Sequence, residues 1–404
     1  MKKLLALFLA LVMILSMTAC GGSSAPAATE AAPAATEAAP AETAAPLDPS
    51  KTTLNIWAFT DEVPGMVEKY LELNPDFAAK YQIKTTIIAT TDQLYQPALD
   101  QALAAGGADA PDLYAAEAAF ILKYSQGDAA KFAAPYEDLG IDIDAEIAAA
   151  DIAQYSVEIG TRPADGKVVA LGYQATGGAF IYRRSIAKDA FGSDDPAVVA
   201  EAIGAGSGNW DKFFEAAETL KGKGYGIISG DGDLWHAVEN SSDAGWIVDG
   251  KLNIDPKREA FLDLSKKLKD NGYHNDTTDW QDAWYADMKD AGEKGVLGFF
   301  GPAWLINYVM AGNSGGTKDS VASGTVMAVS NGELEFLGGQ NMFEAFVPAN
   351  AYANGKCLTQ YDEAINAYWR DAVRQYTAGA MARDEAIEFF KQQVADNLDV
   401  EVEF

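Results

Sequence analysis

Short apolar segments alternate with longer amphipathic segments along the first part of the folded body. Residues 53–58 (TLNIWA) predict a strand, and Met66, Val67, Tyr70 and Leu71 recur with helical spacing soon after it. The predicted elements are, in order, strand 53–58, helix 62–73, strand 81–89, helix 92–105 and strand 111–114. This βαβαβ order predicts an α/β lobe with a largely parallel sheet.

A different local pattern begins at Asp165-Gly166-Lys167, which is a tight-turn sequence. Apolar runs 168–172 and 179–183 follow as predicted strands, and helices are predicted around 185–191 and 210–221. We place a second lobe here. The chain from Lys51 onward is too long for one compact core, so two domains are also the expectation from length.

The extreme N-terminus has a separate pattern. Lys2 and Lys3 precede an apolar run, 4–17, which is shorter than the roughly 20 residues that a bilayer-spanning helix needs. Small residues flank Cys20, so residues 1–20 read as an export signal ending at a lipidated cysteine. The tripeptide before Cys20 resembles the lipobox of bacterial lipoproteins. The alternative is an ordinary signal peptide with an incidental cysteine.

Residues 21–50 contain a repeated PAATEAA unit, at 26–32 and 33–39, and no large apolar residue before Leu47. Such a segment cannot bury enough surface to offset its ordering entropy, so we expect a disordered tether. The expected location is the extracellular face of the bacterial cell membrane, with the body held there through the lipid anchor.

The formal net charge is −29, which excludes favourable binding to nucleic acid or to anionic lipid headgroups. Once Cys20 is lipidated, only Cys357 remains, so no intramolecular disulfide can form. His236 and His274 are the only histidines and are far apart in the chain. We therefore expect no metal site. We also expect no cofactor and a monomer.

Several motifs follow one another in a specific order. They are ALGYQATGG (170–178) with YRR (182–184), WIVDGKL (246–252), GPAW (301–304), and LGGQN (337–341) with QYD (360–362). In this order and spacing the chain resembles the extracellular solute-binding proteins of carbohydrate ABC importers. The resemblance implies a two-lobed, periplasmic-binding-protein-like α/β fold with a sugar cleft between the lobes, an ABC permease as partner, and no enzymatic activity. The implied division is 51–162 with 293–345 as lobe 1 and 163–292 with 346–404 as lobe 2.

Residue chemistry also favours a sugar site. A pyranose offers an apolar C–H face and a rim of hydroxyls, which suit aromatic surfaces and fixed amide or carboxylate acceptors. The ligand-binding candidates are Trp57, Asp61, Glu62, Tyr114, Glu117, Tyr173, Gln174, Trp235, Trp246, Trp284 and Trp304. The resemblance favours Trp304, Tyr173 and Gln174 among them. For any single tryptophan, packing is the competing explanation, and we assign Trp210 and Trp369 to packing.

The chain departs from the resemblance at one place. Relatives carry an aromatic platform and a lobe-crossing region of several dozen residues before the LGGQ element, whereas here only residues 331–336 separate Ser330 from Leu337. Part of the implied site is therefore absent, and an inactivated binder is one alternative.

Three other functions remain open. An extracellular glycosidase could pair Asp61 or Glu62 on one lobe with Asp231 or Asp233 on the other. A solute-binding protein for a non-sugar ligand would share the fold. A surface adhesin would fit the tether but not the two-lobe pattern.

Overall fold

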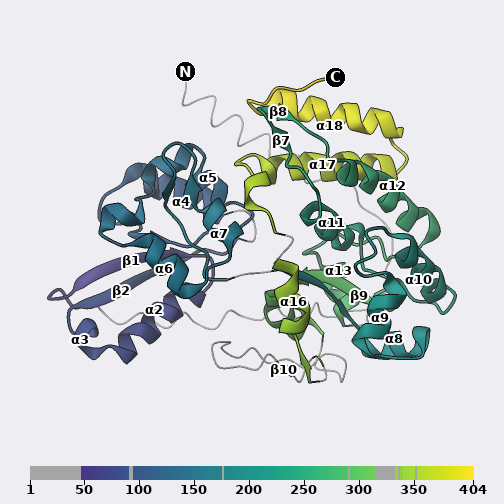
Figure 1. Cartoon of the computed structure of the whole chain (residues 1–404), viewed down its shortest axis with the longest axis horizontal. Coiled ribbons are helices and arrows are strands. Elements are labelled where there is room, and N and C mark those ends of the chain that lie inside the picture. The colour runs from purple at the N-terminus through teal and green to yellow at the C-terminus, as the bar shows by residue number, and fades with distance from the viewer. Residues whose placement is uncertain are drawn as a thin grey trace, which may run out of the picture.

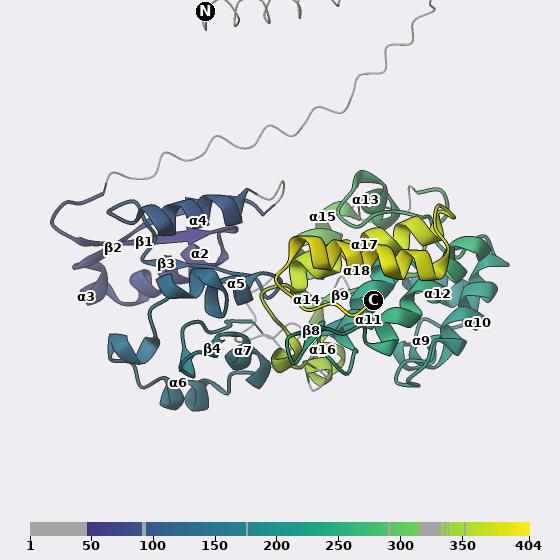
Figure 2. The same cartoon turned by 90° about the horizontal axis from the view of Figure 1, so that it is seen from above.

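The computed structural model describes residues 47–90, 94–174, 177–289, 292–314, 333–334, 337, 339–350 and 353–404. These residues form two lobes that lie side by side (Figure 1 and Figure 2). The predicted signal (1–20), Cys20 and most of the predicted tether (21–50) lie outside the described residues. Within the described ranges, no helix combines the length and the apolar character needed to cross a bilayer.

The first lobe is built on a three-stranded parallel sheet in the order β2-β1-β3. β1 (Thr52–Ala58) lies between β2 (Tyr81–Ile87) and β3 (Leu113–Tyr114) and is parallel to both, as the βαβαβ order predicted. The helices are α2 (Glu62–Leu73), α3 (Pro75–Ala78), α4 (Tyr95–Ala105), α5 (Ile121–Ser125), α6 (Ile143–Ala150) and α7 (Gln154–Ile159), with 3-10 turns η2 (Asp128–Phe132) and η3 (Tyr136–Leu139). Tyr95, Leu99 and Phe120 are buried at the centre of the lobe core.

A small hairpin, β4 (Thr161–Arg162) with β5 (Lys167–Val168), also belongs to the first lobe. Gly166 makes its turn with φ of 71°, a conformation that glycine adopts without strain. Arg162 donates to the carbonyl oxygens of Ala130 and Ala133, and Lys167 pairs with Asp138 at 2.9 Å. The expectation that the second lobe begins at residue 163 is therefore wrong, because these contacts tie the hairpin to the first lobe.

The second lobe begins with β6 (Gly178–Tyr182), which pairs antiparallel with β9 (Gly298–Pro302). The sheet continues at Val296, which bridges Gly226 in parallel. The helices are α8 (Arg184–Phe191), α9 (Pro196–Ile203), α10 (Asp211–Lys221), α11 (Asp231–Asn240), α12 (Pro256–Asn271), α13 (Asp282–Met288), α14 (Ala303–Leu305), the π-helical turn η4 (Ile306–Met310), α15 (Ala311–Asn313), α16 (Phe343–Ala349), α17 (Asp362–Thr377) and α18 (Arg383–Asn397). The remaining elements are the hairpins β7 (Ile247–Val248) with β8 (Lys251–Leu252) and β10 (Glu333–Leu334) with β11 (Gln340–Asn341), and the 3-10 turn η8 (Gly355–Cys357).

The stretch 293–345, expected in the first lobe, lies in the second lobe wherever it is described. β9 takes its strand partner from β6, and Phe299, Leu305 and Ile306 pack in one cluster with Ile181 and Trp284. That part of the expected division is wrong, because strand pairing and burial both hold the segment on β6.

The largest core of the described residues lies in the second lobe, where α17 and α18, at the top of the lobe in Figure 1, pack with α11 and α12. Trp369 is fully buried, with its ring centroid 5.0 Å from Phe390. Trp210 packs edge-on against Phe213. Both tryptophans assigned to packing from the sequence therefore pack in this core, and the assignment is confirmed.

Candidate ligand-binding site

Glu62 is the centre of a polar contact between distant parts of the chain. It is the first residue of α2, which begins just after the carboxyl end of β1, where open α/β sheets bind their ligands. Its carboxylate accepts from Tyr173 Oη at 3.1 Å and from Gln174 Nε2 at 2.7 Å. Three residues predicted from the sequence therefore meet: Glu62 of α2, and Tyr173 and Gln174 of the segment that leads from the first lobe into the second.

The second lobe adds Tyr308 to this contact. Burial raises the pKa of the Tyr308 phenol, and the hydrogen-bonded carboxylate of Glu62 raises it further, as does nearby Asp61. Tyr308 lies on η4, and 59% of its surface is exposed. It was not among the residues predicted from the sequence. The sequence feature that could have indicated Tyr308 is its spacing of four residues from Trp304 on one helical stretch. This spacing places the two side chains on one face of that stretch.

Three further predicted residues lie at the carboxyl edge of the first-lobe sheet. Trp57 of β1 and Tyr114 of β3 are register partners, and Glu117 follows β3 closely. The Trp57 indole N–H is buried and has no hydrogen-bond partner among the described residues. Trp57 and Tyr114 both pack against the first-lobe core. Burial raises the pKa of the Tyr173 phenol, and the charges of Glu62 and Glu117 raise it further, so both carboxylates lie near the crossing segment.

A second contact joins the lobes through Gln96 of α4 and Glu363 of α17. The Gln96 amide donates to the two Glu363 oxygens at 3.2 and 3.4 Å. Burial raises the pKa of Glu117, and the charge of Glu363 raises it further, so these two carboxylates lie near each other. The groups that shift the pKa values of Glu117, Tyr173 and Tyr308 are acids and phenols, with no cation among them.

Trp304 is stacked on another tryptophan, Trp280. The ring centroids lie 6.1 Å apart and the planes are 21° from parallel. Trp304 is half-buried against the second-lobe core, whereas 48% of Trp280 is exposed. Trp304 thus lies beside the site on the surface of the second lobe, one turn before Tyr308. Trp280 was not among the predicted residues, although it lies in the same acidic stretch as Trp284, which was.

Three predicted ligand contacts are corrected because the structure buries them. Trp246 has no exposed surface; its indole donates to Asn366 at 2.7 Å. Trp235 packs at 4.9 Å from Phe261, and Trp284 is buried beneath Trp280 and Tyr285. Their large apolar surfaces fill the second-lobe core, so packing explains all three.

The carboxylates of the glycosidase alternative do not face each other. Asp233 is buried and accepts from the backbone N–H groups of Ser229 and Gly230 at 3.2 Å each. Asp231 pairs with Arg370 at 3.0 Å. Both are held inside the second lobe, away from Glu62. In the described ranges, no three His, Cys, Asp or Glu side chains gather as a metal site.

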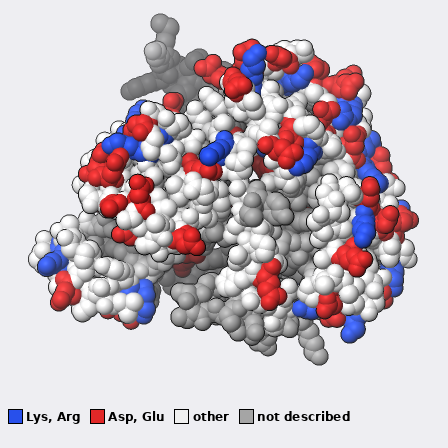
Figure 3. All heavy atoms as spheres, in the orientation of Figure 1, with Lys and Arg blue, Asp and Glu red and all other residues white. Residues whose placement is uncertain are grey.

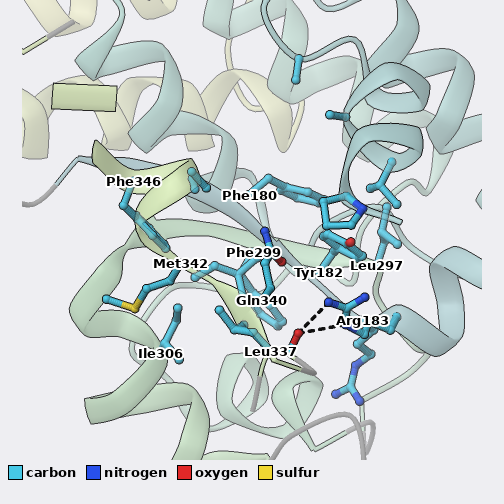
Figure 4. Close-up of a pocket in the computed structure, with 18 of the residues that line it drawn as sticks. Phe180, Tyr182, Arg183, Leu297, Phe299, Ile306, Leu337, Gln340, Met342 and Phe346 are labelled. Atoms are coloured by element: carbon cyan, nitrogen blue, oxygen red, sulfur yellow. Dashed lines mark hydrogen bonds between the residues drawn. The ribbon is translucent and has the colours of Figure 1, made fainter. Parts of the chain in front are cut away.

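A separate cavity of about 520 Å³ lies inside the second lobe, between β6 and α16 (Figure 4). Its wall is mostly apolar and includes Phe180, Phe299, Met342 and Phe346. Arg184 donates to the carbonyl oxygen of Leu337 at the cavity, from Nη2 at 2.6 Å. None of the residues predicted to bind ligand is among its described lining residues, so this cavity is distinct from the contact around Glu62.

Acidic side chains are spread over both lobes on the face shown in Figure 3 and outnumber basic ones there. This distribution agrees with the formal net charge of −29. The surface therefore offers no large basic patch on that face for a polyanionic partner.

Comparison with known proteins identifies the fold and the family. The chain resembles a solved extracellular solute-binding protein of family 1, with 18% identity and a TM-score of 0.61 over 85% of this chain and 99% of that one. It resembles the galacto-N-biose-/lacto-N-biose I-binding protein of Bifidobacterium longum, solved with lacto-N-biose, with 16% identity and a TM-score of 0.64 over 88% of this chain and 100% of that one.

A third similar structure is the GacH receptor of Streptomyces glaucescens, solved unliganded and with acarbose, with 15% identity and a TM-score of 0.59 over 86% of this chain and 99% of the receptor. No curated protein sequence matches the chain. These likenesses confirm the two-lobed, periplasmic-binding-protein-like fold. A family model described as bacterial extracellular solute-binding protein matches residues 72–378, and the chain belongs to that family.

Proposed function

We propose that this chain is the substrate-binding component of an ABC importer and captures a mono- or oligosaccharide between its two lobes. The observation that carries the proposal is the Glu62 carboxylate, held by Tyr173 and Gln174 and facing Tyr308. Half-buried Trp304 lies one helical turn before Tyr308 and stacks on the exposed Trp280. Carboxylate, amide and phenol groups suit sugar hydroxyls, and indole surfaces suit a pyranose face.

The ligands of similar structures support a sugar. The Bifidobacterium longum protein holds lacto-N-biose, the Streptomyces glaucescens receptor holds acarbose, and a solute-binding protein of Thermotoga lettingae holds α-D-tagatose. Delivery to a permease follows from the same role. A sugar bound by residues of both lobes draws them together, so the permease can distinguish loaded from empty protein by shape.

The proposed role is binding without catalysis. The acidic residues that a glycosidase would need on the second lobe, Asp231 and Asp233, are engaged in internal contacts, which favours a binder. A non-sugar ligand is the second candidate. Glu62 and Glu117 lie in acidic surroundings, where a cationic ligand would gain electrostatic attraction. These surroundings therefore favour a positively charged ligand as the non-sugar candidate.

The proposed location is the outer face of the bacterial membrane, with the body as a monomer held through a lipid on Cys20. The support is the export pattern of residues 1–20 and the polar, Pro- and Ala-rich tether that follows.

The test is a panel of mono- and oligosaccharides, including lacto-N-biose and α-D-tagatose, added to the purified protein. We expect one or more sugars to change tryptophan emission, to reduce the radius of gyration in small-angle scattering and to be recovered unchanged. Recovery of a cleaved sugar would assign an enzyme. Absence of binding across the panel would overturn the sugar assignment and leave the non-sugar candidate.

A further inference from the structure

The loop that carries Trp280 has an unusual backbone. Trp280 has φ of 65° and Asp276 has φ of 56°. A positive φ is tolerated by aspartate but is an outlier for a bulky side chain such as tryptophan. The surrounding structure must therefore hold Trp280 in this conformation, and such strain persists where a side chain is needed in one orientation.

The N-terminal turn of α11 supplies the support. The Asp279 carboxylate lies against Gly232, and the Thr277 carbonyl lies against Gly230, so closely that a Cβ on either glycine would overlap them. Asp279 Oδ2 also lies 3.4 Å from His236 Nε2 on the same helix. Only glycine at 230 and 232 lets Thr277 and Asp279 come this close to α11. These close contacts fix the residues on the N-terminal side of Trp280.

The other side of Trp280 rests on aromatic rings. Its ring centroid lies 5.3 Å from Trp284 and 6.1 Å from Trp304. Trp284 is itself fixed, because its indole donates to the buried carboxylate of Asp233 at 3.3 Å. The indoles of Trp284 and Trp304 thus support the indole of Trp280, yet 48% of Trp280 remains exposed to solvent. A large apolar ring that is held rigidly and still left open has surface available for a ligand.

We propose that Trp280 is the residue on which a sugar ring of the ligand stacks, and that Asp279 is its positioning residue. This inference rests on the proposed function and adds a contact on the second lobe. It specifies a ligand with an apolar ring face, such as a pyranose. The ring is already in place without ligand, so little ordering entropy is lost on binding.

The experiment measures the dissociation constant of the best sugar of the panel for the full chain and its variants. Trp280→Ala should weaken binding at least tenfold, and Trp280→Phe should weaken it less. Trp280→Gly should bind as weakly as Trp280→Ala but melt at a higher temperature, because glycine adopts φ of 65° without strain. Trp210→Ala, which truncates a tryptophan of the second-lobe core, is the control and should leave the dissociation constant unchanged.

The role of Asp279 is tested by a double-mutant cycle. Asp279→Ala should weaken binding, yet Asp279→Ala combined with Trp280→Ala should bind no more weakly than Trp280→Ala alone, because the carboxylate acts through the indole. Additive losses would overturn the positioning role. Equal affinity of the unmodified chain and Trp280→Ala would overturn the inference while leaving the proposed function intact, whereas failure of the unmodified chain to bind any panel sugar would overturn both.

Discussion

The side-chain amide of Gln174 donates to the carboxylate of Glu62 over 2.7 Å, although 112 positions separate the two residues in the chain. The bond links the first turn of α2 to the segment that leads into β6. A carboxylate has further acceptor capacity beyond the bonds it makes to Gln174 and Tyr173. Glu62 is thus held in position while it can still accept from a ligand hydroxyl.

Glu62→Gln should weaken sugar binding by about 1.4 kcal/mol or more, a factor of ten, because a hydrogen bond to a charged group contributes about 1.5–3 kcal/mol. Isothermal titration with the best panel sugar measures the change. Glu68→Gln, an exposed carboxylate on the same helix, is the matched control and should bind normally. Equal losses of affinity in the two variants would mean that the net charge of the protein, and not the position of Glu62, determines sugar binding.

Trp304→Ala and Trp369→Ala should separate binding from stability. Trp369 is fully buried, so its truncation should lower the free energy of unfolding by about 3–5 kcal/mol and leave the affinity of the folded protein unchanged. Trp304 is half-buried beside the site, so its truncation should cost less stability and weaken binding about tenfold. Denaturant titration and sugar titration of each variant give the two quantities. A larger stability loss for Trp304→Ala would assign that ring to packing.

Two glycine-to-alanine changes in helices should act in opposite directions. Gly65 of α2 has open space around it, so alanine there should stabilise the protein by up to about 1 kcal/mol through helix propensity. Gly232 of α11 touches the Asp279 carboxylate, so alanine should destabilise the protein and displace the Trp280 loop. Thermal unfolding measures whether each variant is more or less stable than the unmodified protein. A stabilising Gly232→Ala would contradict the close contact between Gly232 and Asp279.

Asp362 should make stability fall as the pH rises from about 4 to 6. One of its oxygens accepts from Thr359, but the other is buried and unpartnered among the described residues. Burial raises the pKa of Asp362 to about 6 in spite of Thr359 and the nearby Arg258, and the charge of Glu239 adds to the rise. The folded protein therefore binds this proton more tightly than the unfolded chain, whose aspartate has its ordinary pKa near 3.9.

Asp362→Asn removes that titration. The free energy of unfolding of the variant, relative to the unmodified protein, should rise between pH 4 and pH 6 by up to about 3 kcal/mol, the value of a two-unit shift. Chemical denaturation across this range measures the difference. A constant difference at every pH would show that the carboxyl group is not desolvated in the folded state.

Cys20→Ser should release the protein from membranes. The apolar run before Cys20 is shorter than a bilayer span, so a lipid on the cysteine is the anchor that we propose. Fractionation of cells after a salt wash measures the distribution, with Cys357→Ser as the matched control. A Cys20→Ser protein that still pellets with membranes contradicts the anchor.

The first-lobe sheet could be predicted from the sequence because its strands and helices alternate with clear periodicity, and α2 was predicted with its observed bounds. The division of the chain between the two lobes was predicted less accurately. Residues 293–345 were assigned by resemblance, whereas the partner of β9 is set by long-range pairing with β6, which leaves no local signal.

Among the site residues, Glu62, Tyr173 and Gln174 were predictable because each follows a strand or lies within a recognisable motif. Trp246 and Trp280 were not predictable, because composition cannot tell a tryptophan that fills a core, such as Trp246, from one that a positive φ holds open to solvent, such as Trp280. That difference depends on Gly230 and Gly232, which lie about fifty residues earlier in the chain.

The core of the first lobe draws all of its described members from one continuous stretch, from Trp57 to Ala129. The second-lobe core, in contrast, joins residues as distant as Ile186 and Val394. Contacts that are close in sequence form quickly because little chain entropy is lost in closing their loops. The first lobe can therefore assemble before the C-terminal helices have been made, and the order of synthesis gives the second lobe a finished surface on which to dock.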